Sequence, residues 1–427
     1  MKLIHSLFFL QLVICFASAQ SEFPEYFHMD KLRFDYSISG DSEKANIQSR
    51  SFYLDKNWGG SLINSIDTFL YGELLLEVFD SATNKLIYSR GYSSLFKEWQ
   101  TIDEADTIKR EFQESIIMPF PKKTVKIKIS ERKFDMSFKG LCSEYFNPEE
   151  HDFLLKESPE YVVKREIINN GLASSKLDLV FLSAGYKEGD STKFFSDVKR
   201  TVQTLFKWIP YSNFKEAFNV WAVFVPSEFI PLCDQKDSIV QRDIVQVHFN
   251  TFDSERYLTT EDISGVRDVL SGIPYDQICI MANSDKYGGG GIYNFITLFT
   301  VDNEYSEFLF HHEFGHGFVS LADEYYSSLV PYDSFVNLEY EPYQPNITTC
   351  IEFNKKWEAL VSDTVPVPTP NSTLYSGVIG LFEGGAYASE GVFRPYFDCT
   401  MKSKINNAFC PVCRKAIEQM ILFYTAE

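Results

Sequence analysis

The stretch "FLFHHEFGHGFVSLADEYY", residues 308–326, decides how this chain is read, because it holds three of the seven histidines in the sequence. Within it, His312, Glu313 and His316 form the pattern H-E-x-x-H. On a helix, side chains four residues apart lie on one face, so both imidazoles can bind one Zn²⁺ at roughly 2.0–2.1 Å. Glu313 lies beside the first ligand and can reach water at the metal as general base. We therefore expect a helix that carries a metal site, and the alternative is an ordinary core helix with solvated histidines.

The spacing leaves the third ligand open. Metzincin-type sites extend the pattern as H-E-x-x-H-x-x-G-x-x-H/D, and Val319 and Ala322 stand here at the glycine and final-ligand positions. The nearest oxygen donors are Asp323 and Glu324. On an unbroken helix Asp323 would lie about 10 Å along the axis from His316, so the helix must end or bend before Ala322 if Asp323 binds the metal. We expect Asp323 to be the third ligand, with Glu324 or a distant Glu or His as alternatives.

A glycine-rich strand precedes the helix. The segment "YGGGGIYNFITLFTV", residues 287–301, lacks the Lys-Ser/Thr of a phosphate loop. Glycine beside a strand permits the close approach of another backbone, and such a strand edge can pair with an extended peptide. We therefore expect Gly289, Gly290 and Tyr293 to contribute to substrate binding.

The first residues predict export. Residues 1–19 combine an N-terminal Lys, an apolar run and the small-residue triplet Ala17-Ser18-Ala19, which is typical of a cleaved signal peptide. The apolar run is shorter than the roughly 20 residues of a spanning helix. We therefore expect a secreted protein without a membrane anchor after cleavage. The sequons at Asn346 and Asn371 predict glycosylated surface loops.

The net charge of −19 argues against nucleic acid or anionic lipid as the main partner. Removal of the signal peptide leaves seven cysteines, and an exported chain favours disulfides for them. The four nearest the C-terminus could alternatively bind structural zinc, which we expect less than disulfides in an oxidising compartment: Cys350, Cys399, Cys410 and Cys413.

The sequence divides into regions with different hydrophobic patterns. Residues 20–145 contain short strand-like runs separated by turn residues, and period-two alternation such as that in residues 125–129 marks half-buried strands. Strands without intervening helices favour a β-sandwich. A polar stretch predicts a junction at residues 146–175.

Residues 176–427 alternate between strand and helix patterns. The run from Leu177 to Gly185 is typical of a buried strand, and residues 191–208 place their apolar side chains on one helical face. Thr259 or Thr260 is expected to open a further helix. The sequence thus predicts an α+β multidomain protein, with an N-terminal β-sandwich followed by an α/β catalytic domain.

Three separated motifs resemble one family. "HHEFGHGFVSLADEYY", "SDKYGGGGIYN" and "DCTMKSKINNAFCPVCR" look like the IgA peptidase family of secreted zinc metallopeptidases, and "LIYSRGYSSLFKEWQTIDEA" resembles the family's N-terminal domain. The resemblance implies a metzincin-like catalytic domain with one Zn²⁺ per chain. It also implies that His312, His316 and Asp323 bind the metal, that Glu313 is the base, and that Met401 is the Met-turn residue beneath the site.

These observations predict a secreted zinc-dependent endopeptidase that hydrolyses peptide bonds in protein or peptide substrates. The alternative is a secreted glycan- or protein-binding module with a vestigial peptidase site. An intact Glu313 and both histidines favour the enzyme. The sequence predicts neither the cleaved sequence nor the oligomeric state.

Overall fold

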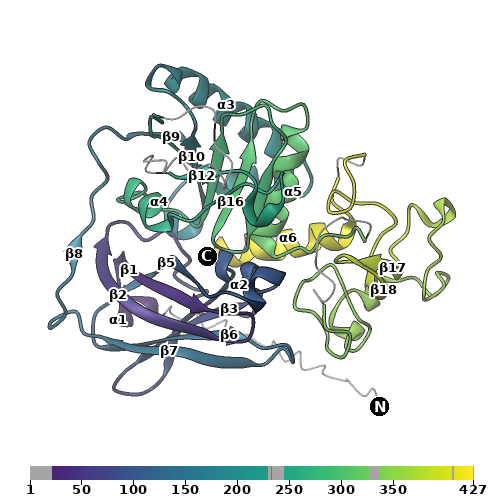
Figure 1. Ribbon diagram of the computed structural model, residues 1–427, viewed down its shortest axis with the longest axis horizontal. Coiled ribbons are helices and arrows are strands. Elements are labelled where there is room, and N and C mark those ends of the chain that lie inside the picture. The colour runs from purple at the N-terminus through teal and green to yellow at the C-terminus, as the bar shows by residue number, and fades with distance from the viewer. Residues whose placement is uncertain (1–21, 229–231, 233–244, 327–335, 406–407, 427) are drawn as a thin grey trace, which may run out of the picture.

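Figure 1 shows a computed structural model of the chain, which describes residues 22–228, 232, 245–326, 336–405 and 408–426. The expected signal segment, residues 1–19, and Cys233 lie outside the described residues. An N-terminal strand-rich region is stacked under a mixed α/β region, and a C-terminal extension packs to one side (Figure 1). This arrangement confirms an α+β protein with more than one structural region.

The N-terminal region consists of two four-stranded sheets. The first has the order β5 (Arg110–Pro121), β1 (Phe27–Gly40), β2 (Ala45–Asp55) and β8 (Leu154–Leu155), and the second the order β4 (Leu86–Tyr92), β3 (Leu74–Asp80), β6 (Val125–Arg132) and β7 (Phe138–Phe146). The alternation expected for β6 is present, since Val125, Ile127 and Ile129 are buried. Both sheets contribute side chains to one core, among them Phe34 and Leu76. Short helices α1 (Phe23–Tyr26) and α2 (Leu95–Trp99) complete the region.

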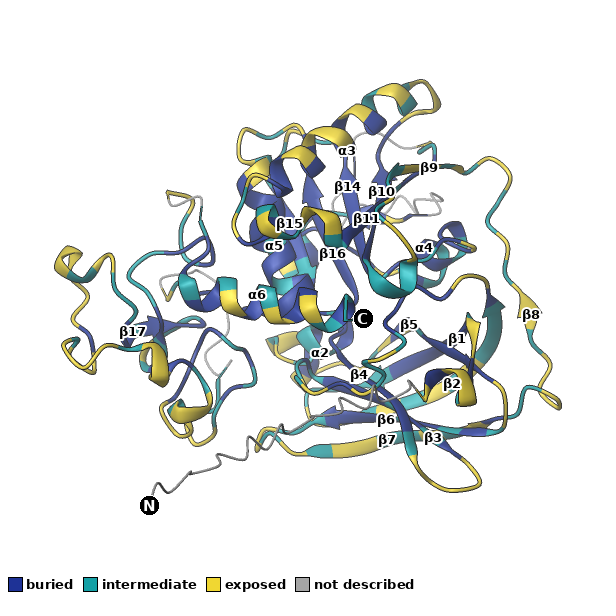
Figure 2. Cartoon of the chain, turned by 180° about the vertical axis from the view of Figure 1, so that it is seen from behind, coloured by how far each residue is buried: buried dark blue, intermediate teal, exposed yellow. Residues whose placement is uncertain are grey.

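The second region is built on a six-stranded sheet. Its order is β15 (Gly289–Ile292), β16 (Ile296–Thr300), β14 (Gln277–Ala282), β10 (Leu177–Ala184), β11 (Phe218–Phe224) and β9 (Val163–Ile168). The four central strands are parallel, and the two edge strands are antiparallel to their neighbours. Every residue of β10 is buried, as the continuous apolar run predicts for a strand covered on both faces (Figure 2).

The two faces of this sheet are covered differently. Helices α3 (Ser191–Leu205), α5 (Ser306–Val319) and α6 (Pro411–Tyr424) share a core with one face, to which Phe181 and Val220 belong. The opposite face contributes Val180 and Leu182 to the core of the N-terminal region, together with Val266 of α4 (Ile263–Val269). This face of the second sheet therefore packs into the core of the N-terminal region together with α4.

Two details differ from the sequence analysis. Strand β9 lies within the stretch expected to be a junction, and it pairs with β11, so the chain has joined the second sheet before residue 176. Thr259 and Thr260 form strand β13, which pairs with β12 (Val247–His248), and do not open a helix. Helix α4 begins at Ile263 because the Asp262 side chain accepts a hydrogen bond from the N–H of Gly265 at 2.9 Å.

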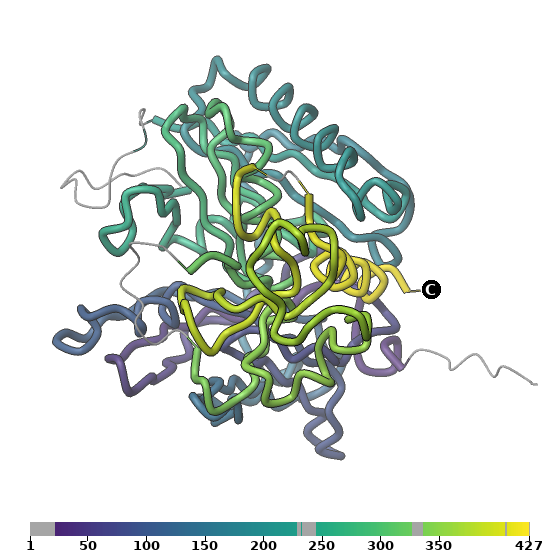
Figure 3. The backbone as a smooth tube through the Cα atoms, turned by 90° about the vertical axis from the view of Figure 1, so that its right-hand side faces the viewer, coloured from purple at the N-terminus to yellow at the C-terminus, as the bar shows by residue number. Residues whose placement is uncertain are grey.

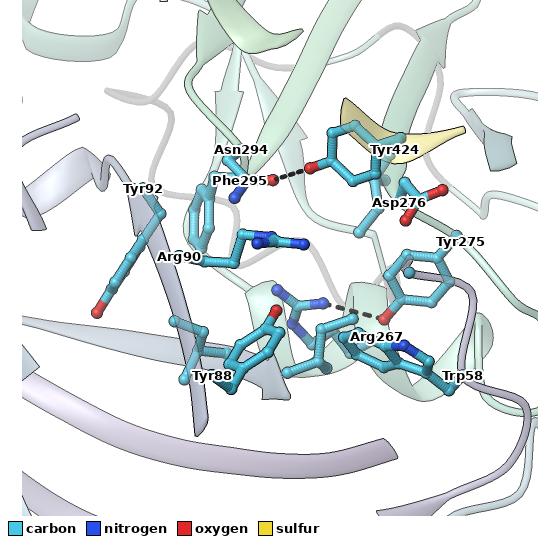
Figure 4. Close-up of a pocket in the computed structure, with 14 residues that line it drawn as sticks. Trp58, Tyr88, Arg90, Tyr92, Arg267, Tyr275, Asp276, Asn294, Phe295 and Tyr424 are labelled. Carbon is cyan, nitrogen blue, oxygen red and sulfur yellow. Dashed lines mark hydrogen bonds between the residues drawn. The ribbon is translucent and has the colours of Figure 1, made fainter. Parts of the chain in front are cut away.

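A cavity of about 60 Å³ lies between the N-terminal region and the second sheet (Figure 4). Polar side chains line it in pairs: Arg267 donates to the Tyr275 hydroxyl at 3.0 Å, and the Tyr424 hydroxyl donates to Asn294 at 3.3 Å. None of its lining residues belongs to residues 308–326. The cavity is thus a feature of the interface between the two regions and is separate from the H-E-x-x-H helix.

The C-terminal extension, seen in front in Figure 3, contains short 3₁₀ turns and the hairpin of β17 (Phe382–Gly385) and β18 (Ala388–Arg394). The chain then returns through residues 399–401 to α6, which contacts α5. Within the described ranges, none of the helices has the length and apolar character needed to cross a bilayer.

Candidate metal centre

Helix α5 carries His312, Glu313 and His316, and it ends three residues after the second histidine, at Val319. Ser320 adopts a left-handed conformation with φ of 56° and donates its N–H to the carbonyl of His316 at 3.0 Å. A residue with positive φ is a common helix terminator because it turns the chain away from the axis. The break that Asp323 requires in order to reach the metal site is therefore present.

Because of this break, one side-chain atom of Asp323 meets one atom each of His312 and His316. The Nε2 atoms of His312 and His316 lie 3.2 Å apart, and Oδ1 of Asp323 lies 3.2 Å and 3.4 Å from them, respectively. All three side chains are largely withdrawn from solvent. The structure thus brings Asp323 to the two histidines and places the side chain of Glu324 elsewhere, against Asn346 and Cys413.

The other nitrogen of each ring determines what these atoms offer. Nδ1 of His312 contacts the carbonyl of Thr400 at 3.0 Å, and Nδ1 of His316 contacts the carbonyl of Leu321 at 2.6 Å. Carbonyl oxygens only accept, so each Nδ1 must donate, and in the neutral ring the Nε2 atom keeps its lone pair. Two lone pairs and a carboxylate oxygen therefore face one another, and Oδ1 of Asp323 makes no hydrogen bond of good geometry within the described residues.

Such a cluster requires a positive charge at its centre. Burial lowers the pKa of His316, but the Asp323 carboxylate outweighs it and raises the pKa of His316 to about 9. Burial likewise raises the pKa of Asp323, but the charge of His316 prevails and holds it well below its usual range. A proton or a metal ion can supply this charge. Tetrahedral zinc with bonds of about 2.0–2.1 Å separates nitrogen ligands by about 3.3 Å, which matches the observed triangle.

The remaining oxygen of Asp323 is oriented by the C-terminal hairpin. The Tyr387 hydroxyl donates a hydrogen bond to Oδ2 of Asp323, and the N–H of Ala386 donates to the Asp323 carbonyl at 2.8 Å. Partners of this kind fix the orientation of a metal-binding carboxylate. The sequence analysis missed Tyr387, because no spacing rule connects it to a residue 64 positions earlier.

Glu313 lies on the same helix, beside the converging atoms, and its side chain is partly exposed. Its side chain rests on the backbone of Gly289, where an added Cβ would come within 2.7 Å of the Glu313 Cγ. Burial raises the pKa of Glu313, while the nearby histidines oppose this shift. A carboxyl group with a raised pKa is suited to accept and then return a proton near neutral pH.

Met401 is fully buried directly beneath the helix. Its Sδ would lie only 2.8 Å from a Cβ added at Gly315, which stands between the two histidines. The neighbouring Thr400 carbonyl orients His312, and the Met401 carbonyl accepts from the N–H of Glu324 at 2.8 Å. The loop at residues 399–401 therefore supports the site from below.

The glycine-rich strand β15 packs on α5, and only Gly and no larger residue fits there. Its outer edge at Gly289, however, already pairs with the segment of residues 256–258 through hydrogen bonds of 3.1 Å. Gly290 faces the Leu258 carbonyl in the same contact. Tyr293 is buried and packs against Tyr71 of the N-terminal region. The close packing explains the glycines, and the expectation that Gly289, Gly290 and Tyr293 contact a substrate stays a prediction.

The third histidine of the helix, His311, is buried and stacks on Trp208 with ring centroids 3.8 Å apart. Two further expectations change. Asn346 is fully buried, and its amide nitrogen donates to Glu324 and to the Ala322 carbonyl, so this sequon is no surface loop. The six cysteines within the described residues are all unpaired, against the expectation of disulfides: Cys142, Cys279, Cys350, Cys399, Cys410 and Cys413.

The N-terminal region also reaches the site. Glu98 of α2 accepts a hydrogen bond from the Tyr257 hydroxyl, and burial raises the pKa of Glu98 to about 8. The pKa of Glu98 is also lowered by His316 and raised by Glu313, which shows that this carboxyl group lies within electrostatic reach of the centre. Glu98 belongs to the motif of residues 86–105, which resembles the family's N-terminal domain. Nothing in the sequence indicated that this residue lies near His316 and Glu313.

Two family models match the chain. The model described as IgA Peptidase M64 matches residues 166–375 and 372–421, and the model described as Peptidase M64 N-terminus matches residues 22–143. The first match includes His312, Glu313, His316, Asp323 and Met401. No curated protein matches the chain.

Proposed function

This chain belongs to the IgA peptidase M64 family, and from that membership and the geometry of the site we propose that it is a zinc-dependent endopeptidase. Membership supports a peptidase. The finer proposal, that His312, His316 and Asp323 bind zinc and that Glu313 moves the proton, rests on the site. The single observation that carries it is the convergence of two imidazole lone pairs and one carboxylate oxygen within 3.2–3.4 Å, with the carboxyl group of Glu313 beside them.

Three protein ligands, rather than four, leave a coordination position open, as catalytic zinc sites do. When bound, zinc supplies Lewis acidity that polarises a scissile carbonyl group and lowers the pKa of water. Glu313 accepts a proton from the attacking water and returns it to the leaving amine. The Thr400 and Leu321 carbonyls hold both rings in one tautomer throughout, so the ligands need no rearrangement.

We further propose, as part of this function, that the protein is exported through residues 1–19 and that its substrates are extracellular proteins or peptides. Secretion from a suitable host followed by N-terminal sequencing tests this directly. We expect the secreted chain to start at Gln20. A chain that stays in the cell with Met1 intact would contradict export.

The peptidase proposal is tested with the purified full-length protein, loaded with zinc and incubated with a panel of unfolded proteins and peptides that includes immunoglobulin A. New termini are identified by mass spectrometry. Glu313→Ala should cut the cleavage rate by about 10²–10⁴ while zinc remains bound. Glu307→Ala is the matched control, because the Glu307 carboxylate faces away on the same helix and accepts from Thr204 at 3.1 Å.

Cleavage that persists in Glu313→Ala would overturn the assigned base. Stoichiometric zinc without any cleavage by the wild-type protein would instead favour the binding-module alternative. The intact Glu313 and its raised pKa are the observations that favour the enzyme over that alternative.

A further inference from the structure

A second cluster of potential ligands lies next to the first, on the other side of the same backbone. Glu324 follows Asp323 in a segment without regular secondary structure, and the two side chains meet different partners, Asp323 the histidines and Glu324 the cysteine side. The Glu324 carboxylate meets Cys399, Cys410 and Cys413, and one ligand atom of each residue lies within 4.8 Å of all the others. All four residues are buried, with exposed fractions between 0% and 3%.

The distances fit a tetrahedral metal ion. Sγ of Cys399 lies 3.8 Å from Sγ of Cys413, which in turn lies 3.4 Å from Oε1 of Glu324. Zinc bonds of about 2.3 Å to sulfur and about 2.0–2.2 Å to oxygen give a tetrahedral sulfur–sulfur edge of about 3.8 Å and a sulfur–oxygen edge of about 3.6 Å. A disulfide would need the two sulfurs at about 2.05 Å.

Backbone donors already point at the sulfurs. The N–H of Cys410 lies 3.3 Å from Sγ of Cys399, and the N–H of Cys413 lies 3.4 Å from Sγ of Cys410, where the chain enters α6. N–H groups in these positions stabilise negative charge on sulfur, as the start of a helix also does. The sulfurs of Cys399 and Cys410 are thus placed as thiolates would be.

The carboxylate is the observation that a disulfide cannot explain. Oε2 of Glu324 is buried and has no hydrogen-bond partner within the described residues, although Asn346 donates to Oε1 at 3.0 Å. A disulfide between two of the three cysteines would leave Oε2 of Glu324 without a hydrogen-bond partner among the described residues. A metal ion satisfies all four groups at once. Cys350, which the sequence grouped with the other three, is exposed and is not part of the cluster.

We propose that Glu324, Cys399, Cys410 and Cys413 bind a structural zinc ion, separate from the peptidase centre. Four buried protein ligands leave no open position, which distinguishes a structural from a catalytic site. The thiol protons are released to solvent when the metal binds, and no oxidant or reductant takes part. The chain would then hold two zinc ions instead of one, whatever its substrate.

The proposed zinc site connects three segments that build or support the peptidase centre. It joins the segment that presents Asp323, the loop of residues 399–401 whose Thr400 carbonyl orients His312, and the first turn of α6. The segment with Asp323 and Glu324 is distant in sequence from the other two, and its backbone meets the loop through the hydrogen bond from the N–H of Glu324 to the carbonyl of Met401. A metal ion here fixes the third ligand and the support beneath the catalytic helix in one position.

The test uses Co²⁺ as the probe in the full-length His312→Ala/His316→Ala protein, which keeps every ligand of the second cluster. We expect one equivalent of cobalt to bind, with the intense thiolate-to-cobalt charge-transfer absorption and visible bands of a tetrahedral sulfur-rich site. Adding Cys413→Ser should abolish the charge-transfer absorption or reduce it strongly. Cys350→Ser is the matched control and should leave the spectrum unchanged.

Absence of charge-transfer absorption in the double-histidine protein would overturn the proposal. So would a disulfide among Cys399, Cys410 and Cys413, detected by peptide mapping without reduction, in the purified wild-type protein. Because the readout is a spectrum of a variant without the peptidase centre, it is independent of whether the wild-type protein cleaves anything. Failure of the peptidase proposal and failure of this one are therefore distinguishable.

Discussion

Gly291 offers the sharpest test of how β15 positions the peptidase centre. A Cβ at this position would lie 2.2 Å from the Glu313 carbonyl oxygen and 2.8 Å from Cβ of His316. Ordinary contacts begin at 3.4 Å, so Gly291→Ala must separate the strand from α5 by about 1.2 Å. The backbone of Gly291 has no left-handed conformation to lose, and the cost is therefore steric only.

This separation should act on both stability and activity. Overpacking of a well-packed contact costs about 1–3 kcal/mol of unfolding free energy. A displacement of about 1 Å at a catalytic group can cost about 100-fold in rate, so kcat/KM for peptide cleavage should fall by about that factor. Urea denaturation measures the first quantity, and cleavage of a peptide identified in the panel experiment measures the second.

The matched control is Gly189→Ala, where an added Cβ meets nothing within 4 Å. We expect its unfolding free energy to stay within about 0.5 kcal/mol of the wild type and its kcat/KM to be unchanged. If Gly291→Ala behaved like Gly189→Ala in both measurements, the close approach of β15 and α5 would be wrong, and with it the reason for the glycine run.

Further tests address other parts of the structure. Tyr387→Phe removes the hydrogen bond to Oδ2 of Asp323 and should weaken zinc affinity by about 10–100-fold in metal-buffered titrations, and an unchanged affinity would show that the hairpin does not orient the ligand. Burial raises the pKa of Glu114 from 4.5 to about 8. Between these values the folded state holds more protons than the unfolded state, so stability falls as pH rises through this window, by up to about 1.4 kcal/mol per pH unit. Glu114→Gln should flatten that slope in urea unfolding measured from pH 5 to pH 8, and an unaltered slope would refute the assignment. Asn346 is fully buried, whereas Asn371, the other sequon asparagine, is exposed. After expression in a glycosylating host, peptide mapping should therefore find no glycan at Asn346. A glycan on folded Asn346 would contradict the packing around Glu324.

Local periodicity explains what could be read directly from the sequence. His312 and His316 are one helical turn apart, so their placement on one face follows from helix geometry alone. The continuous apolar run of β10 and the alternation in β6 likewise report the burial of the faces on which they lie. The helix break before Asp323 was a geometric requirement of the spacing, and the left-handed Ser320 fulfils it.

Contacts between distant residues account for the features that the sequence patterns did not reveal. The sequence did not indicate that the backbone segment 256–258 and α5 lie beside the glycines of β15. Asn346 fits a glycosylation pattern over three residues, but its burial depends on Ala322 and Glu324, more than 20 residues earlier. Such patterns contain no information about which distant segment will cover them.

Neighbours within one or two turns set the helix with the H-E-x-x-H pattern and the alternation of strands and helices, and the sequence also lists the residue types available for metal binding. Contacts in the folded protein assign the two neighbouring carboxylates to different clusters: Asp323 faces the histidines, while Glu324 faces the cysteines. They also exclude Cys350 from the cysteine cluster and place Tyr387 and Met401 against the site. The physical reason is that ligand geometry is set at a scale of a few tenths of an ångström by contacts between segments, and sequence spacing does not encode those contacts.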